Sequence, residues 1–287
     1  MYNTLMSKTP KLAIFDIDGT IAVKGEIPPV ILEGFHHLHD LGCVTTVSTG
    51  RGYVRLKELL GDLFDTIISP EAPVIIEHGT KIVHRDGKLI FGEFFSEHEI
   101  DHVADFTRAN IGLFKLAWFN PLDITQKVQV WCADERDVAE ETAKRGHYAD
   151  VFSSSIGDLE ERLLAQRLTN VTLRLKDYVK VENLKLAFTR TETFVIFQDG
   201  NMEFVKANTN KGLAVLYAAK KLRLKAQDVL VAGNAINDIE MLDLGVGTAI
   251  LVGQGKVRAT ILAYLSSPQE IITVDTPEDL GKYLIAL

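Results

Sequence analysis

Short apolar runs alternate with amphipathic segments along most of this chain. The run at residues 12–15 predicts a strand buried on both faces, and similar runs at 43–47, 228–232 and 248–252 predict further strands. Apolar residues at a spacing of three or four predict helices between and after them. The other elements expected in these regions are strands 66–69 and 74–76, helices 30–41, 53–60, 239–244, 257–265 and 277–287, and a helix that opens at Lys211.

Residues 82–205 differ in character from the flanking sequence. Asp-Gly pairs at residues 86–87 and 199–200 lie between strand-like runs, and each predicts a hairpin. Between the hairpins we expect helices 96–110, 134–147 and 158–166 and strands 113–119, 127–132 and 170–176. Ser96, three residues before Glu99, predicts a capping box at the first of these helices. This order predicts an inserted α+β domain, an antiparallel sheet with helices on one face.

The length of 287 residues suggests about two domains. A net charge of −8 argues against non-specific nucleic-acid binding, which needs a basic surface. Cys43 and Cys132 lack metal-type spacing and lie in apolar runs, which favours buried thiols over a disulfide. The first ten residues lack the apolar core of a signal peptide, and no run has the length of a membrane span. We therefore expect a cytoplasmic protein that does not bind membranes.

Two aspartates follow the first predicted strand. Asp16 and Asp18 are two positions apart, so in an extended backbone their side chains point to the same side. Gly19 then allows a sharp turn. Two carboxylates this close repel each other, and a divalent cation such as magnesium would relieve the repulsion. The simpler alternative is an acidic turn after a strand.

Other segments carry candidate chemistry as well. In Ser48-Thr49-Gly50-Arg51, a hydroxyl and a glycine between a strand and a helix suit an anion such as phosphate, although an ordinary helix cap is the alternative. Lys211 lies in the first turn of its helix, where the helix dipole disfavours a cation. That cost hints at a function, whereas a surface lysine is the simpler interpretation.

Together these segments resemble the four motifs of the haloacid dehalogenase superfamily of phosphohydrolases. Asp-Ile-Asp-Gly-Thr at residues 16–20 resembles the first motif, and Val-Ser-Thr-Gly-Arg at 47–51 resembles the second, in the Thr-Gly-Arg variant of Cof-type sugar phosphatases. Lys211 resembles the lysine of the third. Gly-Asn-Ala-Ile-Asn-Asp at 233–238 resembles the fourth, but Asn234 stands where the pattern has aspartate. His78 stands where Cof-type enzymes have the asparagine of an Asn-Gly loop near the substrate.

The resemblance implies a Rossmann-like α/β core with a parallel sheet, formed by residues 1–81 and 206–287. Residues 82–205 would form a type II cap that closes over the site. An open α/β sheet independently favours a site at the carboxyl ends of its strands.

The resemblance also assigns roles to residues. Asp16 would attack phosphorus, Asp18 would act as general acid and base, and Lys211 would pair with the phosphate and Asp16. The substrate-binding set would be Gly19, Thr49, Gly50, Arg51 and His78, and the Mg²⁺ set would be Asp16, Asp18, Asn234, Asn237 and Asp238.

The expected function is a magnesium-dependent phosphatase acting on a small phosphorylated metabolite, foremost a sugar phosphate. The long insertion argues against macromolecular substrates, because a lid of that size would leave them little room. Two alternatives stay open: a phosphomutase of the same superfamily, and a catalytically silent phosphometabolite-binding protein, which only Asn234 favours. The expected partner is a small phosphate ester, and the expected assembly is a monomer or weak homodimer.

Overall fold

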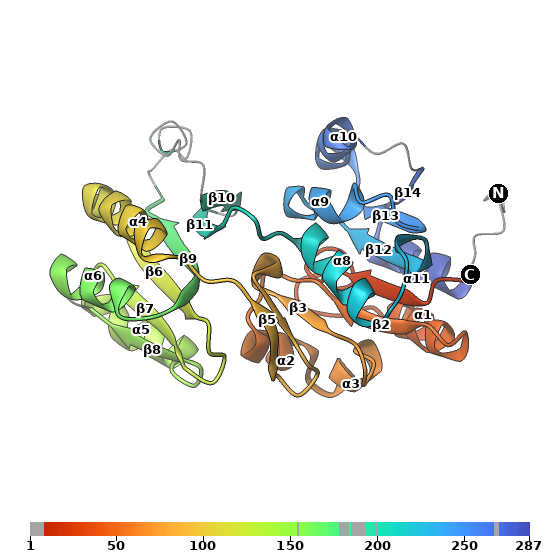
Figure 1. Ribbon diagram of the computed structural model, residues 1–287, viewed down its shortest axis with the longest axis horizontal. Coiled ribbons are helices and arrows are strands. Elements are labelled where there is room, and N and C mark those ends of the chain that lie inside the picture. Colours follow the sequence, from red (N-terminus) through yellow and green to blue (C-terminus); the bar gives the residue numbers. More distant parts are fainter. Residues whose placement is uncertain (1–8, 154, 178–183, 185–192, 199, 267–269) are drawn as a thin grey trace. The chain divides into compact units, whose positions relative to one another are not determined.

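The structure is a computed structural model that describes residues 9–287 except 154, 178–183, 185–192, 199 and 267–269. Most of the N-terminal stretch interpreted above and the hairpin residue Asp199 lie outside the described residues. The chain divides into two compact units (Figure 1). Unit 1 comprises Met1–Phe91 and Asn210–Leu287, and unit 2 comprises Gly92–Thr209.

Unit 1 is built on a five-stranded sheet in which every neighbouring pair is parallel. Its order is β14 (Ile271–Val274), β13 (Thr248–Val252), β12 (Val229–Gly233), β1 (Leu12–Phe15) and β2 (Val44–Val47). This confirms the predicted α/β core with a parallel sheet. The edge strand β14 was not predicted, although its sequence Ile-Ile-Thr-Val is as long as that of β2 and more apolar.

The central strand β1 is covered on both faces. All four of its side chains are fully buried, and Leu12, Ile14 and Phe15 each contribute about 1.5–3 kcal/mol of burial free energy. In register, Phe15 lies opposite Val47 of β2 and Ala232 of β12. The three strands therefore end at the same edge, and the residues that follow them start from neighbouring positions.

Helices flank this sheet. They are α1 (Pro29–Asp40), α2 (Tyr53–Leu60), α8 (Lys211–Lys221), α9 (Ile239–Leu242), α10 (Gly255–Tyr264) and α11 (Pro277–Ile285). The predicted apolar spacing is confirmed in α1, where Ile31, Phe35 and Leu38 are fully buried. In α8, Val215 and Ala218 pack in one cluster with Ile14 of β1.

The prediction of a strand at residues 66–69 was wrong. This segment ends a short helix, α3 (Phe64–Ile67), in which the Ile68 N–H donates to the Phe64 carbonyl at 3.0 Å. The apolar pair Ile67–Ile68 is buried by that helical turn, so its hydrophobicity did not identify a strand. The Ser69 hydroxyl then accepts the Thr45 N–H at 2.9 Å.

A three-stranded sheet of β3 (Val74–Ile76), β4 (Lys81–Val83) and β5 (Leu89–Gly92) completes unit 1. Because β4 and β5 join the sheet that contains β3, the first boundary between the units falls after Phe91 rather than after residue 81. The second boundary falls after Thr209 rather than after residue 205, because the Thr209 N–H and hydroxyl both donate to the carbonyl of Lys206 at the end of β11.

Unit 2 is the inserted α+β domain. Its six-stranded sheet has the order β10 (Thr193–Gln198), β11 (Asn201–Lys206), β9 (Leu168–Leu175), β6 (Phe114–Pro121), β7 (Val128–Cys132) and β8 (Ala149–Phe152). The helices among its described residues are α4 (Glu97–Asn110), α5 (Arg136–Arg145) and α6 (Ile156–Leu164). The capping box of Ser96 and Glu99 at the start of α4 is confirmed.

Two details of unit 2 differ from the prediction. The sheet is antiparallel except for β7 and β8, which pair in parallel and therefore need the crossover helix α5. Helices also lie on both faces. Ala117 and Phe119 of β6 face the core shared with α4 and α6, whereas the Arg145 guanidinium of α5 lies 5.4 Å from the ring of Trp118, which points to the other face.

Candidate active site

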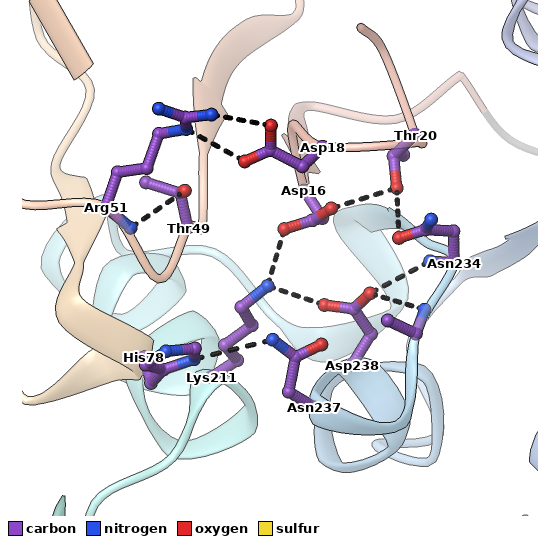
Figure 2. A network of polar contacts seen from close by, with 11 residues as sticks. Asp16, Asp18, Thr20, Thr49, Arg51, His78, Lys211, Asn234, Asn237 and Asp238 are labelled. Atoms are coloured by element: carbon purple, nitrogen blue, oxygen red, sulfur yellow. Dashed lines mark hydrogen bonds and ion pairs between the residues drawn. The ribbon is translucent and has the colours of Figure 1, made fainter. Parts of the chain in front are cut away.

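Polar side chains gather where the central strands of unit 1 end (Figure 2). Asp16 follows β1, Thr49 lies two residues after β2, and Asn234 follows β12. Lys211 at the start of α8 and Asp238 in the loop after β12 complete the group. Residues that are more than 200 positions apart in sequence thus meet at one edge of the sheet, where the sequence predicted a site.

Lys211 is the centre of a buried network. Its Nζ lies 2.6 Å from Asp16 Oδ1 and 2.6 Å from Asp238 Oδ1, and the Lys211 side chain is 0% exposed. The other Asp238 oxygen accepts the N–H groups of Asn234 and Ala235, at 2.9 and 3.0 Å. Both oxygens of Asp238 are thereby engaged by the protein, so this carboxylate holds Lys211 and the loop after β12 together.

The charges in this network shift each other's pKa values. Burial, followed by the nearby charge of Asp238, raises the pKa of Asp16 to about 6, although Lys211 opposes this rise. Burial alone would lower the pKa of Lys211, but Asp16 and Asp238 raise it overall, so the ammonium stays charged. Removing one partner of a buried pair typically costs about 3–5 kcal/mol, which makes the network important for stability as well.

The helix start explains how Lys211 reaches the site. Asn210 caps α8, because its Oδ1 accepts the Leu213 N–H at 2.8 Å. Lys211 is therefore the first helical residue, as predicted. The unfavourable interaction with the helix dipole is offset by two carboxylates within hydrogen-bond distance.

Asp18 has a different environment from Asp16. Its carboxylate accepts two hydrogen bonds from Arg51, from Nε and from Nη2, both at 2.8 Å. The pair is open to solvent, with 51% of the Asp18 side chain and 29% of the Arg51 side chain exposed. Asp16 and Asp18 thus come from one strand end, but one is buried and the other lies at the surface.

Thr49 and Gly50 form the loop after β2. The Thr49 hydroxyl oxygen accepts the Arg51 N–H at 3.1 Å, so its own hydrogen can be donated to another oxygen. Gly50 packs tightly on the His78 imidazole, since a methyl group on Gly50 would lie 2.5 Å from the ring carbon Cε1. The loop is thus held from two sides.

His78 belongs to a turn with an unusual backbone. Glu77, His78 and Gly79 have φ values of +49°, +57° and +90°. Such conformations cost non-glycine residues of order 1–3 kcal/mol each and persist only where the surroundings enforce them. Here Glu77 forms a buried ion pair with Lys81, with Oε1 and Nζ 2.9 Å apart.

Gly19 and Asn234 approach each other closely. Gly19 has a φ of +85°, and a side chain there would begin 2.1 Å from Asn234 Nδ2. The Thr20 hydroxyl lies 3.1 Å from Asp16 Oδ2 and 3.3 Å from Asn234 Oδ1. Asp16 Oδ2, the carboxylate oxygen that does not contact Lys211, and the amide oxygen of Asn234 are therefore neighbours around one hydroxyl group.

The five predicted metal ligands separate into two groups. Asp16 Oδ2 and Asn234 Oδ1 lie together, and both are hard oxygen donors that suit a magnesium ion retaining several waters. The Asp18 and Asp238 side chains are bonded to Arg51 and Lys211, and Asn237 Nδ2 lies 3.5 Å from His78 Nδ1. The donor pair fits a divalent cation with one carboxylate. Within the described residues, no group of three or more His, Cys, Asp or Glu side chains is arranged for a metal.

Sequence reasoning missed three residues of this region. Thr20 follows the Asp-x-Asp-Gly pattern directly, and its hydroxyl could have been noted there. Glu77 and Lys81 flank the predicted turn at a spacing of four, but nothing in the sequence indicates that this pair is buried. Among the described residues, no helix has the length and apolarity needed to cross a membrane.

Comparison with known proteins gives a consistent result. The family of haloacid dehalogenase-like hydrolases matches residues 13–269. The HMP-PP phosphatase of Cronobacter sakazakii is 26% identical over 254 residues, which cover 85% of this chain and 84% of that protein. A HAD/Cof-like hydrolase from Plasmodium vivax, described as putative, has a TM-score of 0.77 at 17% identity, covering 98% of this chain and 96% of that one.

A sugar phosphatase of HAD subclass IIB has a TM-score of 0.73 at 17% identity, covering 96% of this chain and 97% of that one. These solved structures share the fold, including the inserted domain. Because the family match spans most of the sequence and includes all four motif regions, the chain belongs to the haloacid dehalogenase-like hydrolases.

Proposed function

We propose that this hydrolase is a Mg²⁺-dependent phosphatase that cleaves a small phosphorylated metabolite through an aspartyl-phosphate intermediate. The observation that carries the proposal is the arrangement of Asp16, Lys211 and Asp18. A buried carboxylate held by an ammonium at 2.6 Å lies beside a second, solvent-exposed carboxylate from the same strand end. The buried position suits Asp16, because a nucleophile must be held in place. The exposed position suits Asp18, because a general acid and base must reach the leaving group and a water molecule.

In the first step an Asp16 oxygen forms a bond to phosphorus, and the bond between phosphorus and the ester oxygen breaks. Asp18 gives its proton to that leaving oxygen. In the second step Asp18 takes a proton from a water molecule, whose oxygen attacks phosphorus and releases Asp16 and inorganic phosphate. Lys211 and the Thr49 hydroxyl would stabilise the negative charge on the phosphoryl oxygens in both steps.

Asp16 Oδ2 and Asn234 Oδ1 would hold the magnesium ion. When bound, Mg²⁺ supplies positive charge that offsets the repulsion between the carboxylate and the phosphate. Asp16 stays oriented by Lys211 on its other oxygen, so one carboxylate can serve both partners. Gly19, Gly50, Arg51 and His78 would line the phosphate-binding region.

The names of relatives support a small substrate, because they include an HMP-PP phosphatase and a sugar phosphatase. We propose a sugar phosphate as the first class to test, with unit 2 acting as the cap that recognises the leaving group. We further propose a cytoplasmic monomer or weak homodimer, in keeping with the two free, buried cysteines.

One observation favours a second candidate. Asn234 leaves the proposed metal pair with a single carboxylate, and a protein that binds phosphometabolites without cleaving them would tolerate that loss.

The test is phosphate release from p-nitrophenyl phosphate and from a panel of phosphorylated metabolites, with Mg²⁺ and with EDTA. We expect magnesium-dependent release by the wild type. Asp16→Asn should show background activity with its fold retained, because Lys211 keeps its contact with Asp238. Mass spectrometry after an acid quench should find the wild-type Asp16 peptide phosphorylated. Near-wild-type turnover by Asp16→Asn would exclude the covalent mechanism. A wild type that binds phosphate esters without releasing phosphate would support the second candidate.

A further inference from the structure

The described part of the chain contains four non-glycine residues with positive φ, and two of them are adjacent and buried. Lys24 and Arg223 occupy exposed turns, where such a conformation is easily accommodated. Glu77 and His78 adopt it next to each other, followed by Gly79. Backbone strain concentrated in a buried turn requires neighbours that enforce it, and it is found preferentially at functional sites.

The turn of Glu77, His78 and Gly79 contacts the loop after β2. The Glu77 N–H donates to the Arg51 carbonyl at 3.2 Å, and the His78 N–H donates to the Thr49 carbonyl at 3.0 Å. The His78 ring covers Gly50 between these two bonds. The backbone of residues 49–51 is thus held against the turn at three successive positions.

The same turn also reaches two other segments of the site. A side chain on Gly79 would begin 2.4 Å from the carbonyl oxygen of Asn210, the residue before Lys211. His78 Nδ1 lies 3.5 Å from Asn237 Nδ2 in the loop after β12 (Figure 2). A change in the backbone path of this turn would therefore displace the loop after β2 or the start of α8.

The ion pair of Glu77 and Lys81 holds the turn in this conformation. Lys81 is the first residue of β4 and lies opposite Ile76 of β3, so its position is fixed by the sheet. Thr80 adds two bonds to the Glu77 carbonyl, from its N–H at 3.1 Å and its hydroxyl at 2.8 Å. A return of Glu77 to an ordinary helical φ would swing its carboxylate away from Lys81 and leave two buried charges apart. Separating the buried pair carries a penalty, so the ion pair opposes relaxation of the strained turn.

We propose that Glu77 and Lys81 are positioning residues for the phosphate-binding loop: their ion pair fixes the left-handed turn, and the turn fixes Thr49 and Gly50. The inference rests on the proposed function only in naming phosphate as the ligand of that loop. Neither residue is required to touch the substrate.

The variant to test is the double substitution Glu77→Gln with Lys81→Met, which removes both charges together. Replacing a buried ion pair by neutral groups of similar size is often tolerated, so the double variant should fold. The control is Asp275→Asn with Arg258→Met, which removes an ion pair between α10 and the residue after β14, two strands from β12 in the same sheet.

Three quantities are measured for each protein: amide hydrogen exchange, the inhibition constant of phosphate, and kcat/KM. Amide hydrogen exchange should increase at least tenfold at residues 48–52 in the Glu77/Lys81 variant and remain unchanged there in the control. The inhibition constant of inorganic phosphate against p-nitrophenyl phosphate hydrolysis should rise about tenfold, and kcat/KM should fall by up to about 10²-fold, the loss expected for a small misplacement of a binding group.

A purely structural ion pair would lower the melting temperature and raise exchange evenly across unit 1, with phosphate inhibition unchanged. That outcome, or unchanged exchange at residues 48–52, would overturn the inference. If the wild type hydrolyses no phosphate ester, the proposed function fails, but the comparison of exchange rates still decides whether the ion pair positions the loop.

Discussion

Arg51 donates two hydrogen bonds of 2.8 Å to the Asp18 carboxylate. Asp18, the residue proposed for proton transfer, is therefore already bound by a cation before any substrate arrives. A phosphate group offers Arg51 the same forked geometry as a carboxylate. Substrate binding would therefore let Arg51 exchange one anionic partner for another, which leaves Asp18 available to the leaving group.

This relationship gives a prediction that separates the two residues. Asp18→Asn should lower kcat by about 10²–10⁴-fold, the usual contribution of general acid–base catalysis. Arg51→Ala removes the same ion pair but keeps the carboxylate, so it should mainly raise KM. Steady-state kinetics with p-nitrophenyl phosphate measures both. Equal losses of kcat in the two variants would show that the ion pair, and not the proton transfer, matters.

Lys211 should be essential for stability. Lys211→Met leaves the buried Asp16 and Asp238 facing each other without their shared cation, which should cost about 3–5 kcal/mol in the free energy of unfolding. Urea unfolding at neutral pH measures the loss. Lys220→Met, on the exposed side of the same helix, is the control and should change stability little. A Lys211→Met protein as stable as the control would mean that the network is weaker than its geometry indicates.

Asp16 should make stability depend on pH in the absence of metal. Burial and Asp238 raise its pKa from 3.8 to about 6, so between these values the folded protein keeps a proton that the unfolded chain has lost. The contribution of Asp16 to the free energy of unfolding therefore falls as the pH rises from about 4 to 6, by at most about 1.4 kcal/mol per pH unit, and is level above that window.

Urea unfolding in EDTA over this pH range measures the effect as a difference between wild type and Asp16→Asn. The wild type should lose stability with rising pH relative to the variant, whose amide does not titrate. Parallel curves for the two proteins would exclude a raised pKa at Asp16.

Asn234 should weaken magnesium binding. Asn234→Asp would place a second carboxylate beside Asp16 Oδ2, which should destabilise the metal-free protein by charge repulsion and strengthen its response to Mg²⁺. Thermal unfolding during a Mg²⁺ titration should show half-saturation at lower metal concentration in the variant than in the wild type. Asn237→Asp adds the same charge near His78 and serves as the control. If Asn234→Asp behaves like the wild type, residue 234 does not contact the metal.

Much of the site could be predicted from the sequence, because strand ends in a parallel sheet meet at one edge. Asp16, Thr49 and Asn234 each follow an apolar run that forms a central strand, and the position of Lys211 at a helix start was readable from the pattern around it. Side-chain contacts between residues far apart in the sequence could not be predicted. Nothing near Asp18 indicates that Arg51, 33 residues later, binds it, and nothing near Glu77 indicates a left-handed backbone.

Some of the mispredicted elements have local explanations. Ile67 and Ile68 are as apolar as a strand but are buried by a short helix, so tertiary packing overrode the pattern. The strands Ala149–Phe152 and Ile271–Val274 were not predicted, and both lie at sheet edges. The first has a weak apolar pattern, whereas the second has one as strong as that of the predicted strand Val44–Val47.

The central position of β1 has a consequence for how the protein is made. Leu12 pairs with Val44 on one side, 32 residues later, and with Val229 on the other, 217 residues later. During synthesis one edge of β1 therefore remains unpaired until all of unit 2 has emerged from the ribosome. Unit 2 has its whole sequence available by then and can fold first. Sheets closed by such distant contacts form slowly, and unpaired strand edges promote aggregation. Chains that stop just before residue 229 should therefore be aggregation-prone and depend on chaperones even though about half of their sequence forms a complete domain.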